Sequence, residues 1–229
     1  MDLLLTNDDG WNAPGLQSLI EVAGKFGNVW VVAPRSQQSG VSHQMTFEQL
    51  MKFEKQGERS YSLDGTPADC VRIGLSQLDM KFDWVLSGVN DGGNLGTDVY
   101  ISGTVAAARE AAFSNIPAIA ISQHRRNYGQ AFDWTASKLL TERVLSFALN
   151  QTRMPRMFSN FNLPDLPLDD AKKAKMTECE LEPSPLPLDY KKTDEGFTYC
   201  GTYNGRGVST GSDVESCFRG EITMTRFRV

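Results

Sequence analysis

The sequence predicts an α/β fold in which a doubly wound, mostly parallel sheet occupies residues 1–163 and a β-rich extension occupies residues 164–229. The first observation behind this prediction is that short, unbroken apolar runs alternate with segments of helical periodicity along residues 1–163. Such runs are typical of strands buried on both faces of a parallel sheet. The second is the composition, because 40% apolar and 22% charged residues are ordinary values for a globular chain.

Four apolar runs are expected to form the central strands. They are Leu3–Leu5, Val29–Val32, Trp84–Leu86 and Ala118–Ile121. Segments with helical spacing separate them, and this alternation predicts parallel strands joined by helices that lie on both faces of the sheet.

The helices are predicted from apolar stripes and capping residues. Leu16 opens a stripe at i, i+3, i+4 and i+7, and a longer stripe runs from Phe132 to Phe147. The segment 66–69 reads Thr-Pro-Ala-Asp, which combines a capping hydroxyl, a proline at the first helical position and a carboxylate at the third. A helix is therefore expected to start there and to run past Leu75.

Two segments break this rhythm. Residues 45–63 contain alternating apolar residues and predict a β insertion after the second strand. Residues 164–229 hold several prolines, with strand-prone stretches at 197–199 and 221–229. Exposed strand edges seek partners, so this extension either lies across its own domain or pairs with another subunit. We expect it to be an oligomerisation element.

Charge and hydropathy exclude several classes of protein. The net charge of -5 and the lack of a Lys/Arg stripe argue against binding to a nucleic acid polymer. No apolar stretch approaches the roughly 20 residues that a membrane span needs. Asp2 follows Met1 where a secretory signal would be basic, so a cytoplasmic location is expected. The four cysteines lack CxxC spacing, which argues against a zinc cluster.

The residues that follow the first strand carry the strongest chemical signal. Ligands of open α/β sheets bind beyond the carboxyl ends of the strands. Asp8 and Asp9 lie there, and neighbouring carboxylates repel each other unless a cation or a shared proton neutralises them. Oxygen donors without nearby His or Cys favour Mg²⁺, Mn²⁺ or Ca²⁺. The alternative is a plain turn over residues 7–10 in which Asp9 caps the next helix.

Other polar residues gain interest from their position at the same predicted edge. Ser39 and Asn90 are neutral oxygen donors in the loops after the second and third runs, although each alone reads as a loop residue. Ser102, Gly103 and Thr104 directly precede a helical run, and the free N–H groups of a helix start suit a phosphate. An ordinary N-cap by Ser102 or Thr104 explains the same residues.

The two histidines receive no firm role. His43 lies shortly after Ser39, where it either contacts a substrate or is merely a solvated loop residue. His124 lies beside two arginines and is assigned no function.

Five blocks together closely resemble the SurE family of stationary-phase survival proteins, which are metal-dependent 5'/3'-nucleotidases. The blocks are Thr6–Gly10, Val32–Pro34 with Ser39–Gly40, Gly65–Val71, Ser87–Asn90 and Ser102–Val105. The resemblance implies a Rossmann-like core that hydrolyses nucleoside monophosphates to nucleoside and phosphate. It also implies homodimers or homotetramers built through the extension, and a divalent cation, Mg²⁺ or Mn²⁺, held by Asp8, Asp9, Ser39 and Asn90.

We further expect phosphate oxygens to be held by Asn94, Ser102, Gly103 and Thr104, and we assign no catalytic acid or base. The end of the chain, Ile222–Val229, departs from the family pattern, which bears on substrate preference and oligomeric state. Two other functions use the same pocket. One is a nucleotide-binding regulator without turnover, and the other is a metal-dependent transferase acting on nucleotide sugars.

Overall fold

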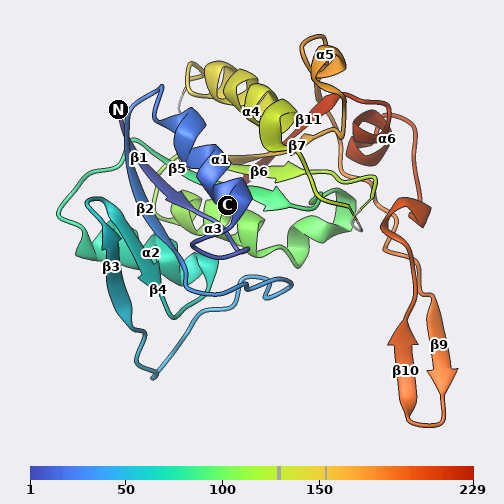
Figure 1. Ribbon diagram of the computed structural model, residues 1–229, viewed down its shortest axis with the longest axis horizontal. Helices are drawn as coiled ribbons and strands as arrows, with labels where there is room; N and C mark the ends of the chain where they lie inside the picture. The colour runs from blue at the N-terminus through green and yellow to red at the C-terminus, as the bar shows by residue number, and fades with distance from the viewer. Residues whose placement is uncertain (128–129, 153) are drawn as a thin grey trace.

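A nine-stranded sheet forms the centre of the molecule among the residues that the computed structural model describes, which are 1–127, 130–152 and 154–229 (Figure 1). The strand order is β3-β4-β2-β1-β5-β6-β7-β11-β8. Its five central strands run parallel to one another. They are β2 (Asn28–Pro34), β1 (Asp2–Thr6), β5 (Trp84–Asp91), β6 (Ala118–Gln123) and β7 (Met157–Leu163).

The predicted apolar runs form buried parallel strands. In β1, Leu3, Leu4 and Leu5 have no exposed surface, and Leu4 is in register with Trp30 of β2 and Val85 of β5. One boundary prediction was wrong. Residues 87–91 were expected to follow the third strand as a loop, but β5 continues through them, with an irregular register between Ser87 and Asn90.

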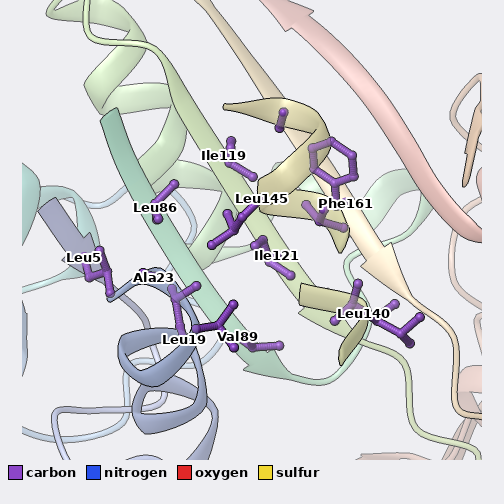
Figure 2. Close-up of a cluster of buried hydrophobic side chains, with 14 of the residues drawn as sticks. Leu5, Leu19, Ala23, Leu86, Val89, Ile119, Ile121, Leu140, Leu145 and Phe161 are labelled. Atoms are coloured by element: carbon purple, nitrogen blue, oxygen red, sulfur yellow. The ribbon is translucent and has the colours of Figure 1, made fainter. Parts of the chain in front are cut away.

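Helices cover both faces of the sheet, which confirms the doubly wound arrangement. Helices α1 (Pro14–Ala23) and α4 (Trp134–Ala148) pack on one face around Phe161 and Ile121 (Figure 2). Helices α2 (Pro67–Gln77) and α3 (Gly103–Phe113) pack on the other face.

The helix starts follow from local capping. The Thr66 hydroxyl accepts a hydrogen bond from Asp69 N, and the Asp69 carboxylate accepts one from Thr66 N, which completes the expected capping box. The longer stripe begins later than predicted, because the Asp133 carboxylate caps α4 by accepting from Thr135 N at 3.0 Å. Phe132 therefore lies before the helix.

The segment between the second strand and α2 contributes two strands to the edge of the sheet. Strand β4 (Ser60–Leu63) pairs parallel with β2, and β3 (Phe53–Gly57) pairs antiparallel with β4. Met45 and Phe47 lie outside these strands in the preceding loop.

The C-terminal extension both joins the sheet and projects from it. Strand β11 (Ile222–Arg228) pairs antiparallel with β7 and parallel with β8 (Met176–Glu178). Strands β9 (Tyr190–Thr193) and β10 (Gly196–Tyr199) form a hairpin that projects away from the sheet (Figure 1). The remaining elements are short: α5 (Leu168–Ala171), α6 (Asp213–Phe218), and the 3-10 turns η1 (Gly96–Tyr100) and η2 (Tyr203–Gly205).

All four cysteines are free thiols, with Cys70 and Cys217 buried. Within the described part of the chain, no helix combines the length and the apolar character that crossing a membrane requires.

Candidate active site

The carboxyl ends of β1, β2 and β5 meet the start of α3 around Asp8. The Asp8 side chain is 5% exposed, and its Oδ1 accepts a hydrogen bond from the Thr104 hydroxyl at 2.5 Å. A Cβ atom on Gly103 would lie 3.0 Å from the Asp8 Cβ, so a larger residue there would crowd the carboxylate. On the other side, Gln38 N donates to the Asp8 carbonyl oxygen at 2.7 Å. Two segments distant in sequence, the start of α3 and the loop after β2, therefore converge on this one residue.

Asp9 is tied to the end of β5. Its Oδ2 accepts a hydrogen bond from Asp91 N at 2.9 Å, which places Asn90 next to this contact. The Asn90 amide donates to Gly92 O at 2.8 Å, so the side-chain nitrogen is used within its own loop. The structure thus brings Asp8, Asp9 and Asn90 to adjoining strand ends, as predicted from their positions after the apolar runs.

The irregular part of β5 is braced by helix α1. A Cβ on Gly15 would lie 1.9 Å from Val89 O, so the first turn of α1 packs directly against the strand that delivers Asn90. Sequence reasoning missed this contact, because residues 87–91 read as a glycine-containing loop.

The pKa values of both carboxylates are raised above the ordinary value of an aspartate. Burial and the neighbouring charge of Asp9 raise the pKa of Asp8 to about 7, although the Thr104 hydrogen bond lowers it. Burial also raises the pKa of Asp9, with a smaller contribution from Asp91. Asn7 adds a buried side-chain oxygen that has no hydrogen-bond partner among the described residues. Two adjacent carboxylates with raised pKa values, one of them buried, make a site that fits a cation.

The donor set consists of oxygen atoms. No group of three or more His, Cys, Asp and Glu side chains with metal-binding geometry occurs in the described ranges. Two carboxylates with neutral oxygen donors suit a hard cation such as Mg²⁺ or Mn²⁺ better than zinc.

Ser39 lies in an exposed loop beside this site. Its hydroxyl accepts a hydrogen bond from Gln37 Nε2 at 2.8 Å. The loop is fixed on both sides of Ser39, because Gln38 N bonds to Asp8 O and Ser42 N donates to Ile101 O at 3.0 Å. Ser39 therefore directly follows the residue whose backbone is bonded to Asp8.

The start of α3 contains three of the four residues expected to hold phosphate. The Ser102 hydroxyl caps the helix by accepting from Val105 N at 3.1 Å, so the N-cap alternative is correct for Ser102. Thr104 does not cap, since its hydroxyl is committed to Asp8. Ser102, Gly103 and Thr104 are all buried, and the last two lie against Asp8.

Asn94, the fourth expected phosphate residue, is buried in a polar network at the carboxyl ends of β6 and β7. Asn94 Nδ2 donates to the Ser122 hydroxyl at 2.7 Å, and Asn94 N donates to Asn162 Oδ1 at 2.7 Å. The Asn94 carbonyl oxygen accepts from the side-chain amides of Asn160 and Asn162 at 3.0 Å each. These bonds fix the start of the loop that leads to Ser102.

The histidines are held by neighbours. His43 is half-buried, with Nε2 2.9 Å from Glu110 Oε2, and it stacks on Phe113. The alternative that His43 is a merely solvated loop residue is therefore wrong. His124 is buried beside Phe218, and burial lowers its pKa.

Sequence reasoning missed a buried arginine next to the site. Arg125 NH1 donates to Asp91 Oδ1 at 2.5 Å, and the Arg125 guanidinium lies over the Phe132 ring. The pair fixes Asp91, whose backbone N–H binds Asp9. The only signal in the sequence was the Arg125–Arg126 doublet, which does not indicate a partner.

Comparison with known proteins gives consistent matches. The sequence model of the family described as survival protein SurE matches residues 3–183. A protein of Nostoc sp. strain PCC 7120, provisionally named a 5'-nucleotidase, is 44% identical over the full length of both chains. The 5'-nucleotidase SurE of Geotalea uraniireducens is 37% identical over 98% of this chain and 92% of its own. The crystal structure of the SurE protein from Aquifex aeolicus superposes with a TM-score of 0.86 and 31% identity, covering 100% of this chain and 93% of that one.

Proposed function

The chain belongs to the SurE family, and from this premise we propose that it is a phosphomonoesterase that hydrolyses nucleoside 5'- and 3'-monophosphates to nucleoside and phosphate. The observation that carries the proposal is the buried Asp8, which lies against the start of α3 and is followed by the half-buried Asp9. Relatives named as 5'-nucleotidases support the reaction class. The 3' activity and the dependence on a metal are further parts of the proposal.

We assign the binding of one divalent cation, Mg²⁺ or Mn²⁺, to Asp8, Asp9, Ser39 and Asn90. The oxygen donors, the raised pKa of Asp8 and the orphaned Asn7 oxygen support this assignment. Orientation of the phosphate, stabilisation of its developing charge and activation of the attacking water are what such a cation supplies when bound.

The residues around the carboxylates have separate tasks. The Thr104 hydroxyl orients Asp8 and favours its charged form. Gly103 lets the α3 backbone approach the same carboxylate closely, and the N–H groups at this helix start offer donors to phosphate oxygens. We place the phosphate between this helix start and Asn94, with Ser102, Gly103 and Thr104 on one side.

The extension would build the homodimer or homotetramer that we propose, with residues 1–163 as the catalytic core. An isolated two-stranded hairpin is marginally stable in water, yet β9 and β10 project with Phe197 72% and Tyr190 58% exposed. Light scattering of the full chain should show an oligomer that Phe197→Ser weakens. A native monomer, or an unchanged oligomer in the variant, would contradict this role of the hairpin.

A phosphate-release assay tests the reaction. The full chain is mixed with nucleoside 5'- and 3'-monophosphates, with Mg²⁺ or Mn²⁺ or with excess chelator. We expect phosphate release that the chelator abolishes, and a loss of several orders of magnitude in Asp8→Asn. Binding of nucleotide without release would identify a regulator, and consumption of a nucleotide sugar only with an acceptor would identify a transferase. Full activity in chelator would remove the metal from the proposal.

A further inference from the structure

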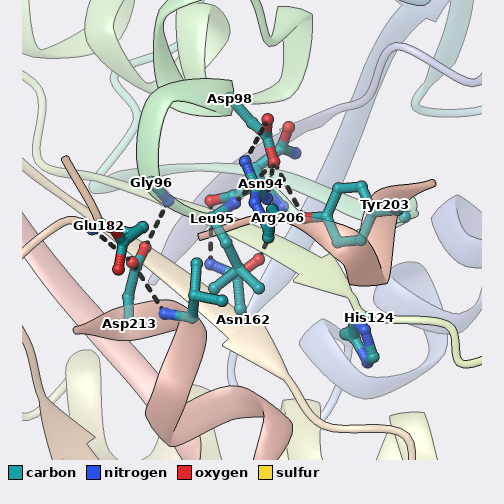
Figure 3. A network of polar contacts seen from close by, with 12 residues as sticks. Asn94, Leu95, Gly96, Asp98, His124, Asn162, Glu182, Tyr203, Arg206 and Asp213 are labelled. Carbon is teal, nitrogen blue, oxygen red and sulfur yellow. Dashed lines mark hydrogen bonds and ion pairs between the residues drawn. The ribbon is translucent and has the colours of Figure 1, made fainter. Parts of the chain in front are cut away.

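The loop that presents the phosphate-binding residues is held from outside by the C-terminal extension. This loop, residues 92–101, begins after β5, contains Asn94 and ends at Ser102, the cap of α3. Residues 182–213 of the extension cross it and contact it at two places (Figure 3).

The first contact is a buried ion pair between Asp98 of the loop and Arg206 of the extension. Arg206 NH1 and NH2 donate to the two Asp98 carboxylate oxygens at 2.6 and 2.9 Å. The Arg206 side chain is 0% exposed and the Asp98 side chain 8%. The Tyr203 hydroxyl donates to the same carboxylate at 2.9 Å, and the Arg206 guanidinium lies over the Tyr203 ring. This bidentate geometry fixes both the position and the orientation of Asp98.

Asp98 passes this constraint to both ends of the loop. Its carboxylate accepts a hydrogen bond from Leu95 N at 3.3 Å, next to Asn94. Its carbonyl oxygen accepts one from Ser102 N at 3.0 Å. The residue that Arg206 holds is therefore bonded directly to Ser102 and to the neighbour of Asn94.

The second contact lies on the other side of the loop. Asp213 Oδ2 accepts from Gly96 N at 2.8 Å, and Asp213 Oδ1 accepts from Glu182 N at 2.9 Å. Gly96 has a φ of +54°, and a Cβ there would lie 2.9 Å from Glu182 O. The loop backbone is thus pressed against the extension at Gly96.

The metal ligands have different supports. Asp8 is held by Thr104 and by the backbone of the β2 loop, and Asp9 by Asp91 N. None of these bonds involves Arg206, Tyr203 or Asp98. Loss of the ion pair is therefore expected to disturb phosphate binding more than the aspartates, although Ser42 N of the β2 loop is hydrogen-bonded to Ile101 O of the same loop.

We propose that Arg206 is a positioning residue for the phosphate: through Asp98 it fixes the loop that presents Asn94 and Ser102. A buried ion pair is weak evidence for stability, because desolvation of both charges offsets their attraction. Its value here is the defined geometry of the loop. This inference rests on the proposed function.

The test compares phosphate affinity with metal activation in the full-length protein. We expect Arg206→Met to raise KM for a nucleoside monophosphate, and the inhibition constant for inorganic phosphate, by roughly ten- to a hundredfold, since small misplacements of binding groups have effects of this size. The metal concentration for half-maximal activity should change much less than these two constants, because no hydrogen bond of Asp8 or Asp9 named above involves Arg206 or Asp98. Arg206→Lys keeps the charge but loses the fork, so it should be intermediate.

Arg219→Met is the matched control, because Arg219 is a half-exposed arginine of the same extension that pairs with Glu215 and Glu221, away from the loop. It should leave all three constants unchanged. Tyr203→Phe removes a single donor to Asp98 and provides a mild variant should Arg206→Met not fold.

The outcomes separate the two proposals. A folded Arg206→Met with native phosphate inhibition, or with phosphate and metal constants weakened together, overturns the positioning role. If Arg206→Met does not fold, native phosphate inhibition in both Arg206→Lys and Tyr203→Phe overturns it. If the native chain releases no phosphate from any nucleotide, the proposed function falls and this inference falls with it.

Discussion

Replacing Asp8 by asparagine should remove activity and at the same time stabilise the metal-free protein. The native carboxylate is 5% exposed, and burial and the charge of Asp9 raise its pKa from 3.8 to about 7. Since the folded state holds the Asp8 proton more tightly than the unfolded chain, stability falls as the pH rises from about 4 to about 7. The penalty is fully present above pH 7. Asparagine has nearly the same shape, carries no charge, and can still accept the hydrogen bond from Thr104.

The magnitude follows from the two pKa values. Each pKa unit corresponds to about 1.4 kcal/mol, so ionisation of Asp8 costs the folded metal-free protein at most about 4 kcal/mol. At pH 8, Asp8→Asn should therefore gain up to about 4 kcal/mol in the free energy of unfolding. In a chain of this size that corresponds to a melting temperature higher by roughly 10 °C. Near pH 4 the gain should disappear, because the native side chain is then protonated.

Urea unfolding in excess chelator at pH 8 and pH 4 measures this difference. Asp169→Asn is the control, because the Asp169 side chain is 86% exposed and its removal should shift neither curve appreciably. Added Mg²⁺ or Mn²⁺ should raise the free energy of unfolding more in the native protein than in the Asp8→Asn variant, since only the native site keeps both charges. If Asp8→Asn is no more stable than the native protein at pH 8 in chelator, the electrostatic account of the site is wrong.

Three further predictions concern the supports of the site. Thr104→Val removes the hydrogen bond that lowers the pKa of Asp8, so the acidic limb of the pH–activity profile should move to higher pH; an unmoved limb would count against the contact. The pKa of Glu182 is lowered to about 2, because hydrogen bonds to its carboxylate outweigh the effect of burial. The charged carboxylate therefore stabilises the fold above about pH 4.5, and this stabilisation is lost as the pH falls towards 2. Glu182→Gln should accordingly lower the free energy of unfolding more at pH 7 than at pH 3, as urea titrations at the two values will show. Gly15→Ala forces a Cβ against Val89 O, so it should lower the melting temperature and raise the metal requirement for activity; native values of both would refute the role of this contact.

The catalytic half of the fold was predictable because its signals are local. A fully apolar run such as Leu3–Leu5 suits a strand buried on both faces, and the Thr66 capping box fixes a helix start within four residues. Asp8 and Asp9 could be placed at the carboxyl edge of the sheet by the same reasoning. Asn90 was placed correctly at this edge, although its strand continues where glycines suggested a loop.

The contacts of the C-terminal extension were not predictable in this detail, because they join residues far apart in the chain. Nothing near Arg206 in the sequence indicates Asp98 as its partner, which lies more than a hundred residues earlier. Strand β11 enters the sheet between β7 and β8, antiparallel to the first and parallel to the second, and its apolar pattern carries no information on these neighbours. Pairing of this kind is decided by the packing of the whole domain.

The projecting hairpin and the residues that contact the site loop are different stretches of the C-terminal extension. The chain leaves the body of the protein after Glu182, forms the β9–β10 hairpin and returns at Tyr203, and each of these two residues is hydrogen-bonded in place. The intervening stretch, 183–202, can therefore be shortened, or exchanged for that of a relative, while the residues at its two ends keep their positions. If the hairpin builds the proposed oligomer, variation there would change which copies associate and leave the carboxylates that follow β1 untouched.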